Sequence, residues 1–236
     1  MGIWGLTNVN IIDLSFNNFV GEMSAQIGNA KNLSQLAIQN NQLSGNLVPE
    51  IGSAQQLVRI QAENNKFTGQ LPKEIGRLKQ LNALYLQENM LEGSIPDEIG
   101  SCKSLTIINL ATNRLDGAIP ETLGSINVLN SLNVSNNKLS GSIPSSLAGL
   151  TLSSIDFSNN QLSGAVPNSL ISVGSRGSFS GNPGLCAKIS SSDDTITVTS
   201  NSSCAQKESG RMKLVASFIA GATVLILVVG LILFLQ

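Results

Sequence analysis

Histidine is absent from the 236-residue chain, and charged and aromatic side chains are scarce. Without histidine the protein lacks the commonest general base and the commonest metal ligand. We find no convergent cluster of titratable groups either, so we predict neither an enzyme nor a cofactor. Only 12% of the residues are charged and the net charge is −1. This leaves no basic patch for a nucleic-acid backbone. Aromatic residues make up 4% of the chain, so something other than aromatic packing must organise its core.

Cysteine is also rare, with only Cys102, Cys186 and Cys204. Cys186 and Cys204 flank a polar stretch rich in serine and threonine, and Cys102 stands alone. The simplest pairing is one disulfide between Cys186 and Cys204. Cys102 is then predicted to be a free, buried and inert thiol. That bridge would close a loop of about 18 residues, worth about 3 kcal/mol in the chain-entropy model. Two free thiols at Cys186 and Cys204 remain the alternative.

An internal repeat takes the place of aromatic packing and determines the architecture. Aligned segments are spaced 24 residues apart five times and then 23, and they begin at Val9, Leu33, Leu57, Leu81, Leu105, Leu129 and Leu152. Their consensus reads LxxLxLxxNxLxGxIPxxIGxxxx. The LxxLxL portion alternates, which predicts a short strand whose leucines point inward. Phe19 and Phe67 occupy a position otherwise held by leucine, so we expect both in the core.

Two further columns of the repeat have a structural reason. Asparagine in a tight bend can bond backbone groups of its own and the adjacent coil, which would otherwise cost about 1–3 kcal/mol each when buried. This predicts a structural ladder of Asn17, Asn41, Asn65, Asn89, Asn113, Asn137 and Asn160. The glycine four residues later permits left-handed backbone, and the Ile-Pro step ends a second extended piece because proline cannot continue a ladder.

The repeats therefore predict an α/β leucine-rich-repeat solenoid. We expect a right-handed superhelix with parallel strands on its concave face and 3-10 or irregular structure on its convex side, plus one transmembrane α-helix. The predicted organisation is a remnant of a preceding repeat at 1–8, seven repeats at 9–173, a C-terminal cap at 174–204, a juxtamembrane linker at 205–213 and the membrane helix at 214–235. The segment SFSGNPGLC breaks the repeat and supplies Phe179 to cover the last coil. The N-terminal edge shows no cap, so we expect a longer solenoid or a partner there.

The span 214–235 is an uncharged apolar run of 22 residues, and a bilayer core needs about 20. Arg211 and Lys213 precede it, which by charge alone favours repeats in the cytosol. The cysteine pair and the three N-glycosylation sequons at Asn32, Asn133 and Asn201 favour repeats outside the cell. We predict a single-pass protein with extracellular repeats and a cytoplasmic portion lying beyond this chain.

The repeat IPxxIG, the cap SFSGNPGLC and the single span resemble plant leucine-rich-repeat receptor kinases over nearly the whole chain. Several stretches look closest to subfamily XI, the HAESA-like and C-terminally-encoded-peptide receptors: NNFVGEMSAQIGNAKNLSQLAIQNNQLSG, RIQAENNKFTGQLP and LTLSSIDFSNNQLSGAVP. The resemblance implies a plasma-membrane receptor whose inner face binds a secreted peptide hormone. It also implies a co-receptor kinase ectodomain docking at the C-terminal repeats and cap. The kinase sequence motifs of that family are absent from this chain.

The resemblance further implies an Arg-x-Arg pair that grips the carboxylate of the peptide. We place that strand one repeat before Val9, and the nearest local match is incomplete, with Arg59 followed by Gln61. Bulky polar residues nevertheless cluster on the predicted concave positions of the second to fourth repeats, and arginine and tyrosine are favoured in interface hot spots. We therefore predict a ligand-binding patch of Gln39, Arg59, Gln61, Glu63, Tyr85 and Gln87, with an ordinary solvated sheet face as the alternative.

Three other functions compete with a receptor ectodomain. A kinase-less receptor-like or decoy protein would compete for the co-receptor. An inhibitor of secreted cell-wall enzymes would share the repeats, but the apolar span argues against a soluble protein. A tail-anchored cytosolic scaffold is compatible with the charges that precede the span.

Overall fold

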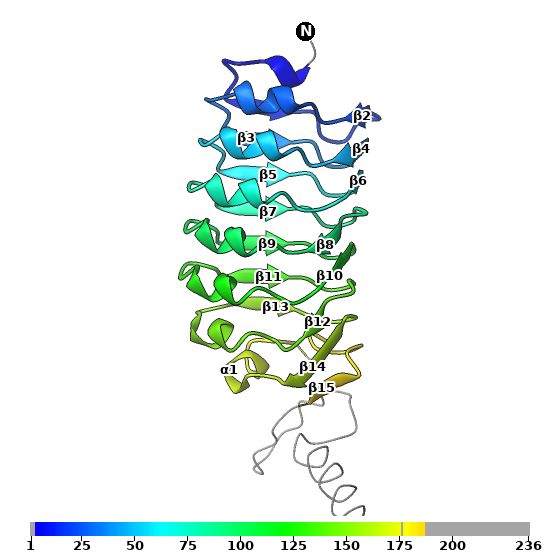
Figure 1. The fold of residues 1–236 in the computed structure, drawn as a ribbon, viewed down its shortest axis with the longest axis vertical. Coiled ribbons are helices and arrows are strands. Elements are labelled where there is room, and N and C mark those ends of the chain that lie inside the picture. Colours follow the sequence, from blue (N-terminus) through cyan, green and yellow to red (C-terminus); the bar gives the residue numbers. More distant parts are fainter. Residues whose placement is uncertain (1–2, 176, 187–236) are drawn as a thin grey trace, which may run out of the picture.

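The computed structural model describes residues 3–175 and 177–186. Its seven repeats are stacked coils, numbered here 1 to 7 from the segment starts at Val9, Leu33, Leu57, Leu81, Leu105, Leu129 and Leu152 (Figure 1). The first strand of each coil joins a seven-stranded parallel sheet in the order β1-β3-β5-β7-β9-β11-β13. These strands are β1 (Ile11–Asp13), β3 (Gln35–Ala37), β5 (Arg59–Gln61), β7 (Ala83–Tyr85), β9 (Ile107–Asn109), β11 (Ser131–Asn133) and β13 (Ser154–Asp156). The predicted leucine-rich-repeat solenoid with parallel strands is confirmed.

A second extended piece follows the bend in each coil and forms shorter parallel sheets of the orders β2-β4-β6, β8-β10 and β12-β14-β15. In coils 1 to 7 the glycine of the second extended piece has a positive φ, between 69° and 99°, a conformation that is strained for residues with a side chain. The strands are β2 (Val20–Glu22), β4 (Gln42–Asn46), β6 (Lys66–Thr68), β8 (Glu92–Ser94), β10 (Arg114–Asp116), β12 (Ser140–Gly141), β14 (Gln161–Ala165) and β15 (Gly184–Cys186).

Short helices form the side of the stack opposite the second strands (Figure 1). A proline ends the second extended piece and is the N-cap of η4 to η7 and of α1, with ψ between 130° and 139°. Because its ring fixes φ and it has no backbone N–H, the extended piece stops there and a helix begins. The 3-10 helices are η1 (Ile3–Gly5), η2 (Ala25–Asn29), η3 (Pro49–Ser53), η4 (Lys73–Arg77), η5 (Asp97–Ser101), η6 (Glu121–Ser125) and η7 (Ser145–Gly149), and the α-helix is α1 (Asn168–Ile171).

The periodic leucines and isoleucines form one hydrophobic core that runs through all seven coils. Phe67 is fully buried in it, as expected. The expectation for Phe19 is wrong, because 44% of its side chain is exposed. Coil 1 has only residues 3–8 before it in the described stack, so its core positions are covered from one side. Phe16 and Val20 of the same coil are 75% and 73% exposed.

The asparagine ladder links each coil to the coil before it. Asn89 Oδ1 accepts a hydrogen bond from the Phe67 backbone N–H at 3.0 Å, and Asn89 Nδ2 donates to the Ala62 carbonyl of coil 3 at 3.0 Å. The same amide also donates to the carbonyls of Leu86 and Gln87 in its own coil. The Asn17 side chain differs, because its amide donates to the carbonyls of Leu14 and Ser15 in its own coil.

The cap segment continues this ladder, which corrects the expectation that SFSGNPGLC breaks the repeat. Asn182 Oδ1 accepts from the Leu162 N–H at 3.0 Å, and its amide donates to the Phe157 and Phe179 carbonyls. Gly181 has a positive φ of 71°, and the residue before each asparagine of the ladder also has a positive φ, between 51° and 57°. Phe179 covers coil 7 as predicted, stacked on Phe157 with ring centroids 5.9 Å apart. The segment is therefore a shortened eighth coil.

Several predictions fall on residues that the structure does not describe. Cys186 is disulfide-bonded, and its predicted partner Cys204 lies outside the described residues, as do Asn201, the linker at 205–213 and the apolar span 214–235. Within the described ranges, no helix has the length and apolar character needed to cross a membrane.

Candidate functional site

The outward side of the seven-stranded sheet, here called the strand face, carries all six residues of the predicted ligand-binding patch. Arg59 and Gln61 lie at the two ends of β5, and Tyr85 ends β7. In the sheet register Tyr85 is paired with Gln61, whereas Arg59 is paired with Gln35 and Ala83. Tyr85 and Arg59 are therefore diagonal neighbours. Gln39, Glu63 and Gln87 follow two residues after their strands.

The strand face satisfies its own polar groups at coils 1, 5, 6 and 7. In each of these coils the last strand residue is Asp or Asn, and its side-chain oxygen accepts the backbone N–H two residues later, as in the pair Asn133 and Ser135 at 3.0 Å. Such a short local bond closes a turn. The residue two positions on is then small: Ser15, Ala111, Ser135 or Ser158. In coil 1 the Ser15 hydroxyl and backbone N–H hold the pKa of Asp13 below its usual value.

Coils 2, 3 and 4 differ, because their strands end in Ala37, Gln61 and Tyr85 and a long polar side chain follows. These side chains, Gln39, Glu63 and Gln87, are named here the acceptor ladder. Gln39 Oε1, Glu63 Oε2 and Gln87 Oε1 are buried, and none has a hydrogen-bond donor within the described part of the chain. Gln39 is only 8% exposed as a whole. Buried polar atoms are normally paired, so three such acceptors in one row make this part of the strand face a candidate binding site.

Glu63 is the charged member of the acceptor ladder, and its surroundings disfavour the charge. Burial raises the pKa of the Glu63 carboxyl above its ordinary value of 4.5, its own backbone N–H lowers it, and the nearby Glu88 carboxylate raises it further. The Arg59 guanidinium belongs to the same coil, but its Cα is four extended residues away, about 13 Å along the strand. The face therefore presents a partly desolvated negative charge.

Glu63→Gln should stabilise the protein at neutral pH, because it removes this charge and keeps an oxygen at the same place. We expect a gain of up to about 1 kcal/mol, or about 2–4 °C in Tm, since part of the side chain is solvated and screened. A raised pKa makes wild-type stability fall as pH rises from 4.5 through the raised value. The advantage of the variant should therefore grow across that window and level off above it. Thermal unfolding of both proteins between pH 4 and 8 measures this, and a variant that is less stable at pH 7 contradicts it.

The sequence identified Gln39, Glu63 and Gln87 one at a time but missed the division of the strand face. The signal was present in two positions of the repeat, the last strand residue and the residue two positions later, whose residue types change together. Where the last strand residue is Asp or Asn, the residue two positions later is Ser or Ala. Where it is Ala, Gln or Tyr, the later residue is Gln or Glu.

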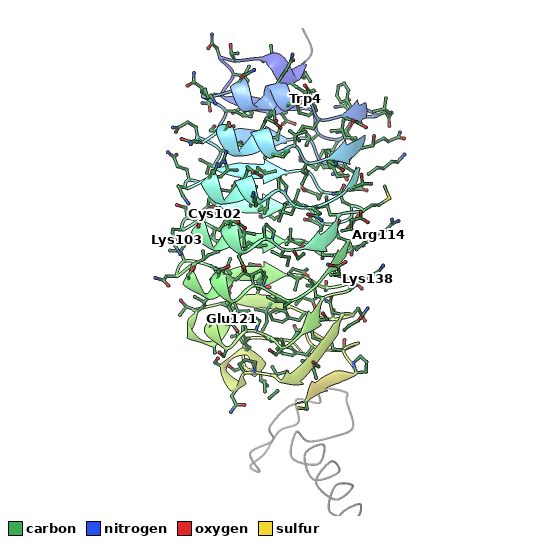
Figure 2. The ribbon with its side chains drawn as sticks, in the orientation of Figure 1. Trp4, Cys102, Lys103, Arg114, Glu121 and Lys138 are labelled. Carbon is green, nitrogen blue, oxygen red and sulfur yellow. The ribbon has the colours of Figure 1, made fainter. Side chains whose placement is uncertain are left out.

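Cys102 is a free, buried cysteine at the C-terminal end of η5, on the helical side of the stack (Figure 2). Its thiol donates to the Ile75 carbonyl at 3.1 Å, and burial raises its pKa to about 11, against smaller lowering effects of Lys79 and the Leu78 backbone. The prediction of a buried free thiol is confirmed. It has no role in the candidate site.

Iodoacetamide should therefore modify native Cys102 very slowly. At pH 8 a thiol with this pKa is about 0.1% thiolate, against about a quarter for an unperturbed cysteine. Ionisation alone predicts a rate at least about 100-fold below that of the urea-unfolded chain, which mass spectrometry of the tryptic peptide measures. Equal rates in the two states would show that the site opens readily.

Two of the predicted sequons lie within the described residues. Asn32 is exposed, next to the end of η2, whereas Asn133 is half-buried in β11 with its Oδ1 bonded to Ser135. Asn32 is thus the sterically freer acceptor for a glycan. Glycosylation at either position stays a prediction.

Comparison with known proteins agrees with the coil geometry. The family model for Leucine Rich Repeat matches residues 80–102, 104–126, 128–150 and 151–173. The Arabidopsis receptor kinase HAESA, solved with the peptide hormone IDA and the co-receptor SERK1, is 40% identical over 80% of this chain and 32% of that chain, with a TM-score of 0.74. The ectodomain of the Arabidopsis membrane receptor kinase GASSHO1/SCHENGEN3 is 34% identical over 76% of this chain and 22% of that one, also at 0.74.

The BIR2 ectodomain from Arabidopsis thaliana is 34% identical over 63% of this chain and 76% of that chain, with a TM-score of 0.53. No curated protein sequence matches the chain. The chain spans about a third or less of HAESA and GASSHO1/SCHENGEN3. It belongs to the leucine-rich-repeat family and is similar to plant receptor ectodomains that bind peptide hormones.

Proposed function

We propose that this member of the leucine-rich-repeat family is the extracellular recognition module of a plant receptor-like kinase of the HAESA-like type. Its repeats face the outside of the cell, and the apolar span 214–235 holds them at the plasma membrane. The strand face of coils 2 to 4 binds a secreted peptide, and the bound peptide recruits a co-receptor ectodomain. The observation that carries this proposal is the acceptor ladder, with three buried and unpaired oxygens in a row.

The strand face suits an extended peptide more than a compact ligand. Gln39, Glu63 and Gln87 are in register, since the N–H of Asn40 donates to the Glu63 carbonyl and that of Asn64 to the Gln87 carbonyl, both at 3.0 Å. Successive coils are therefore about 5 Å apart along the ladder. Arg59 and Tyr85 lie on the same face, and they are residue types that commonly anchor interfaces. The ladder and these anchors together form a polar track across three coils.

Coils 5 to 7 and the cap suit a second protein. Their strand-face residues are short and already bonded within each coil, so another surface can approach without leaving polar groups unpaired. HAESA, a similar receptor, was solved in complex with both a peptide hormone and the co-receptor SERK1. We place the co-receptor of this protein at coils 5 to 7 and the cap, beside the bound peptide.

A selection experiment tests the proposal with the full chain in detergent. The chain is immobilised and challenged with a phage-displayed library of random dodecapeptides. We expect enriched peptides that bind the wild type and lose binding to the Arg59→Ala/Tyr85→Ala double variant. A matched control, Lys73→Ala in η4, changes an exposed residue away from the strand face and should bind normally.

The co-receptor step is tested with the same peptides. We expect the SERK1 ectodomain to be captured by the chain only when a selected peptide is bound. Failure to enrich any peptide, or peptides that bind the double variant as well as the wild type, would refute the proposed site.

A further inference from the structure

The atoms of the acceptor ladder determine which chemical group can bind there. All three unpaired atoms, Gln39 Oε1, Glu63 Oε2 and Gln87 Oε1, are oxygens that accept hydrogen bonds. They lie on three adjacent coils about 5 Å apart, with the charged one in the middle. The complementary group must therefore donate several hydrogen bonds over more than one coil and carry one positive charge at its centre.

The remaining charges near the ladder do not supply that group. Glu88 follows Gln87 directly in the chain and adds negative potential at Glu63. Arg59 is exposed and four residues upstream of Glu63, and Lys66 donates instead to Gln42 Oε1 at 3.0 Å. A cation at the ladder therefore has to come from a bound partner.

Arginine fits this description better than lysine. The guanidinium is planar and carries five N–H donors in a fixed fork, so it can bond Glu63 and reach a glutamine of a neighbouring coil at the same time. It is also less strongly hydrated than an ammonium ion, which favours it at a site whose oxygens are already shielded from water.

The ladder also has defined ends. On one side coil 1 closes with the Asp13–Ser15 turn, and on the other coil 5 closes with the Asn109–Ala111 turn. Neither turn leaves an oxygen of the ladder type, so the unpaired acceptors are confined to three coils. A row of acceptors of this length suits one side chain of a peptide that continues along the face.

We propose that the acceptor ladder binds the guanidinium of an arginine in the peptide ligand, with Glu63 as the ion-pair partner and Gln39 and Gln87 as flanking acceptors. This inference rests on the proposed function, and it assigns a required residue to the ligand. It predicts a receptor that selects against peptides without an arginine at one position.

The test extends the dodecapeptide selection to two charge variants of the full chain. Wild type, Glu63→Gln and Glu92→Gln are selected in parallel, where Glu92 is an exposed carboxylate in β8, outside the strand face. We expect a fixed arginine in the peptides enriched by the wild type and by Glu92→Gln, and no such arginine with Glu63→Gln. Lysine in place of arginine, or no basic position, overturns the inference while peptide binding itself still stands. If the wild type enriches no peptide, the proposed function fails and this inference falls with it.

A double-mutant cycle then tests direct contact with one selected peptide. Its arginine is replaced by citrulline, which keeps the shape and removes the charge. We expect either change alone, citrulline or Glu63→Gln, to weaken Kd about 10- to 100-fold, and the two together to cost little more than one. Additive losses would place the arginine away from Glu63.

Discussion

Replacing Asn89 by alanine should lower the free energy of unfolding by about 3–4 kcal/mol, the largest effect expected outside the leucine core. The substitution leaves the buried Phe67 N–H of coil 3 without its acceptor and removes three bonds that the amide donates to carbonyls. Denaturant unfolding followed by circular dichroism measures the loss. Hydrogen exchange at the Phe67 amide should quicken in the same variant, because that N–H loses the Asn89 oxygen that accepts its hydrogen bond.

The chain contains its own control for this experiment. Asn17 occupies the same position of its coil, but it is exposed and its side-chain amide donates to carbonyls of coil 1 itself. Asn17→Ala should therefore cost less than about 1 kcal/mol. Equal losses at the two positions would mean that the ladder acts through the local bend and not through the bond between coils.

Gly76→Ala should cost about 2–3 kcal/mol for a different reason, because a side chain there would collide with backbone. A Cβ on Gly76 would lie 2.4 Å from the Glu98 carbonyl oxygen of the next coil. Unlike a side chain, a backbone oxygen cannot turn away, so η4 and η5 would have to separate. The same close approach to a carbonyl oxygen recurs between successive 3-10 helices, at Gly28, Gly52 and Gly100.

Gly149→Ala is the matched control. No atom lies within 4 Å of a Cβ built there, and coil 6 is one residue shorter than coils 1 to 5. Its helix ends in Leu150 with ψ 151°, whereas η2 to η6 end with ψ between 67° and 79°. This substitution should be neutral or stabilise by about 0.4–1 kcal/mol through the unfolded chain. Melting temperatures of the two variants decide the matter, and a large loss at Gly149 would count against a packing explanation for Gly76.

Most of the fold was predictable because the same 24-residue repeat determines both the local structure of a coil and its contacts with the next coil. Leu84 and Asn89 each have a counterpart one repeat away, so alternation predicts a strand and the asparagine column predicts a ladder. The place of Asn182 in the asparagine ladder was missed because its segment lacks the LxxLxL pattern that identifies a coil. The exposure of Phe19 was missed because burial in a stack depends on both neighbours, and residue type reports on neither.

The candidate site was predictable by residue but not by arrangement. Position within the repeat places Gln39, Glu63 and Gln87 on the strand face. Whether their oxygens are paired depends on rotamers and on what lies beside them. Asn133 and Glu63 are both polar strand-face residues, yet Asn133 caps a turn and Glu63 Oε2 has no donor among the described residues.

The columns that hold the coils together and the columns that face outward are different positions of one repeat. Asn89 can therefore stay unchanged while Gln87 and Tyr85, two and four residues away, vary freely. A lineage can acquire a new ligand by substitutions on the strand face alone, without any compensating change in the scaffold. Duplication of a whole repeat would likewise extend the strand face and keep the hydrogen bonds between successive coils. The architecture thus separates the evolution of recognition from the evolution of stability.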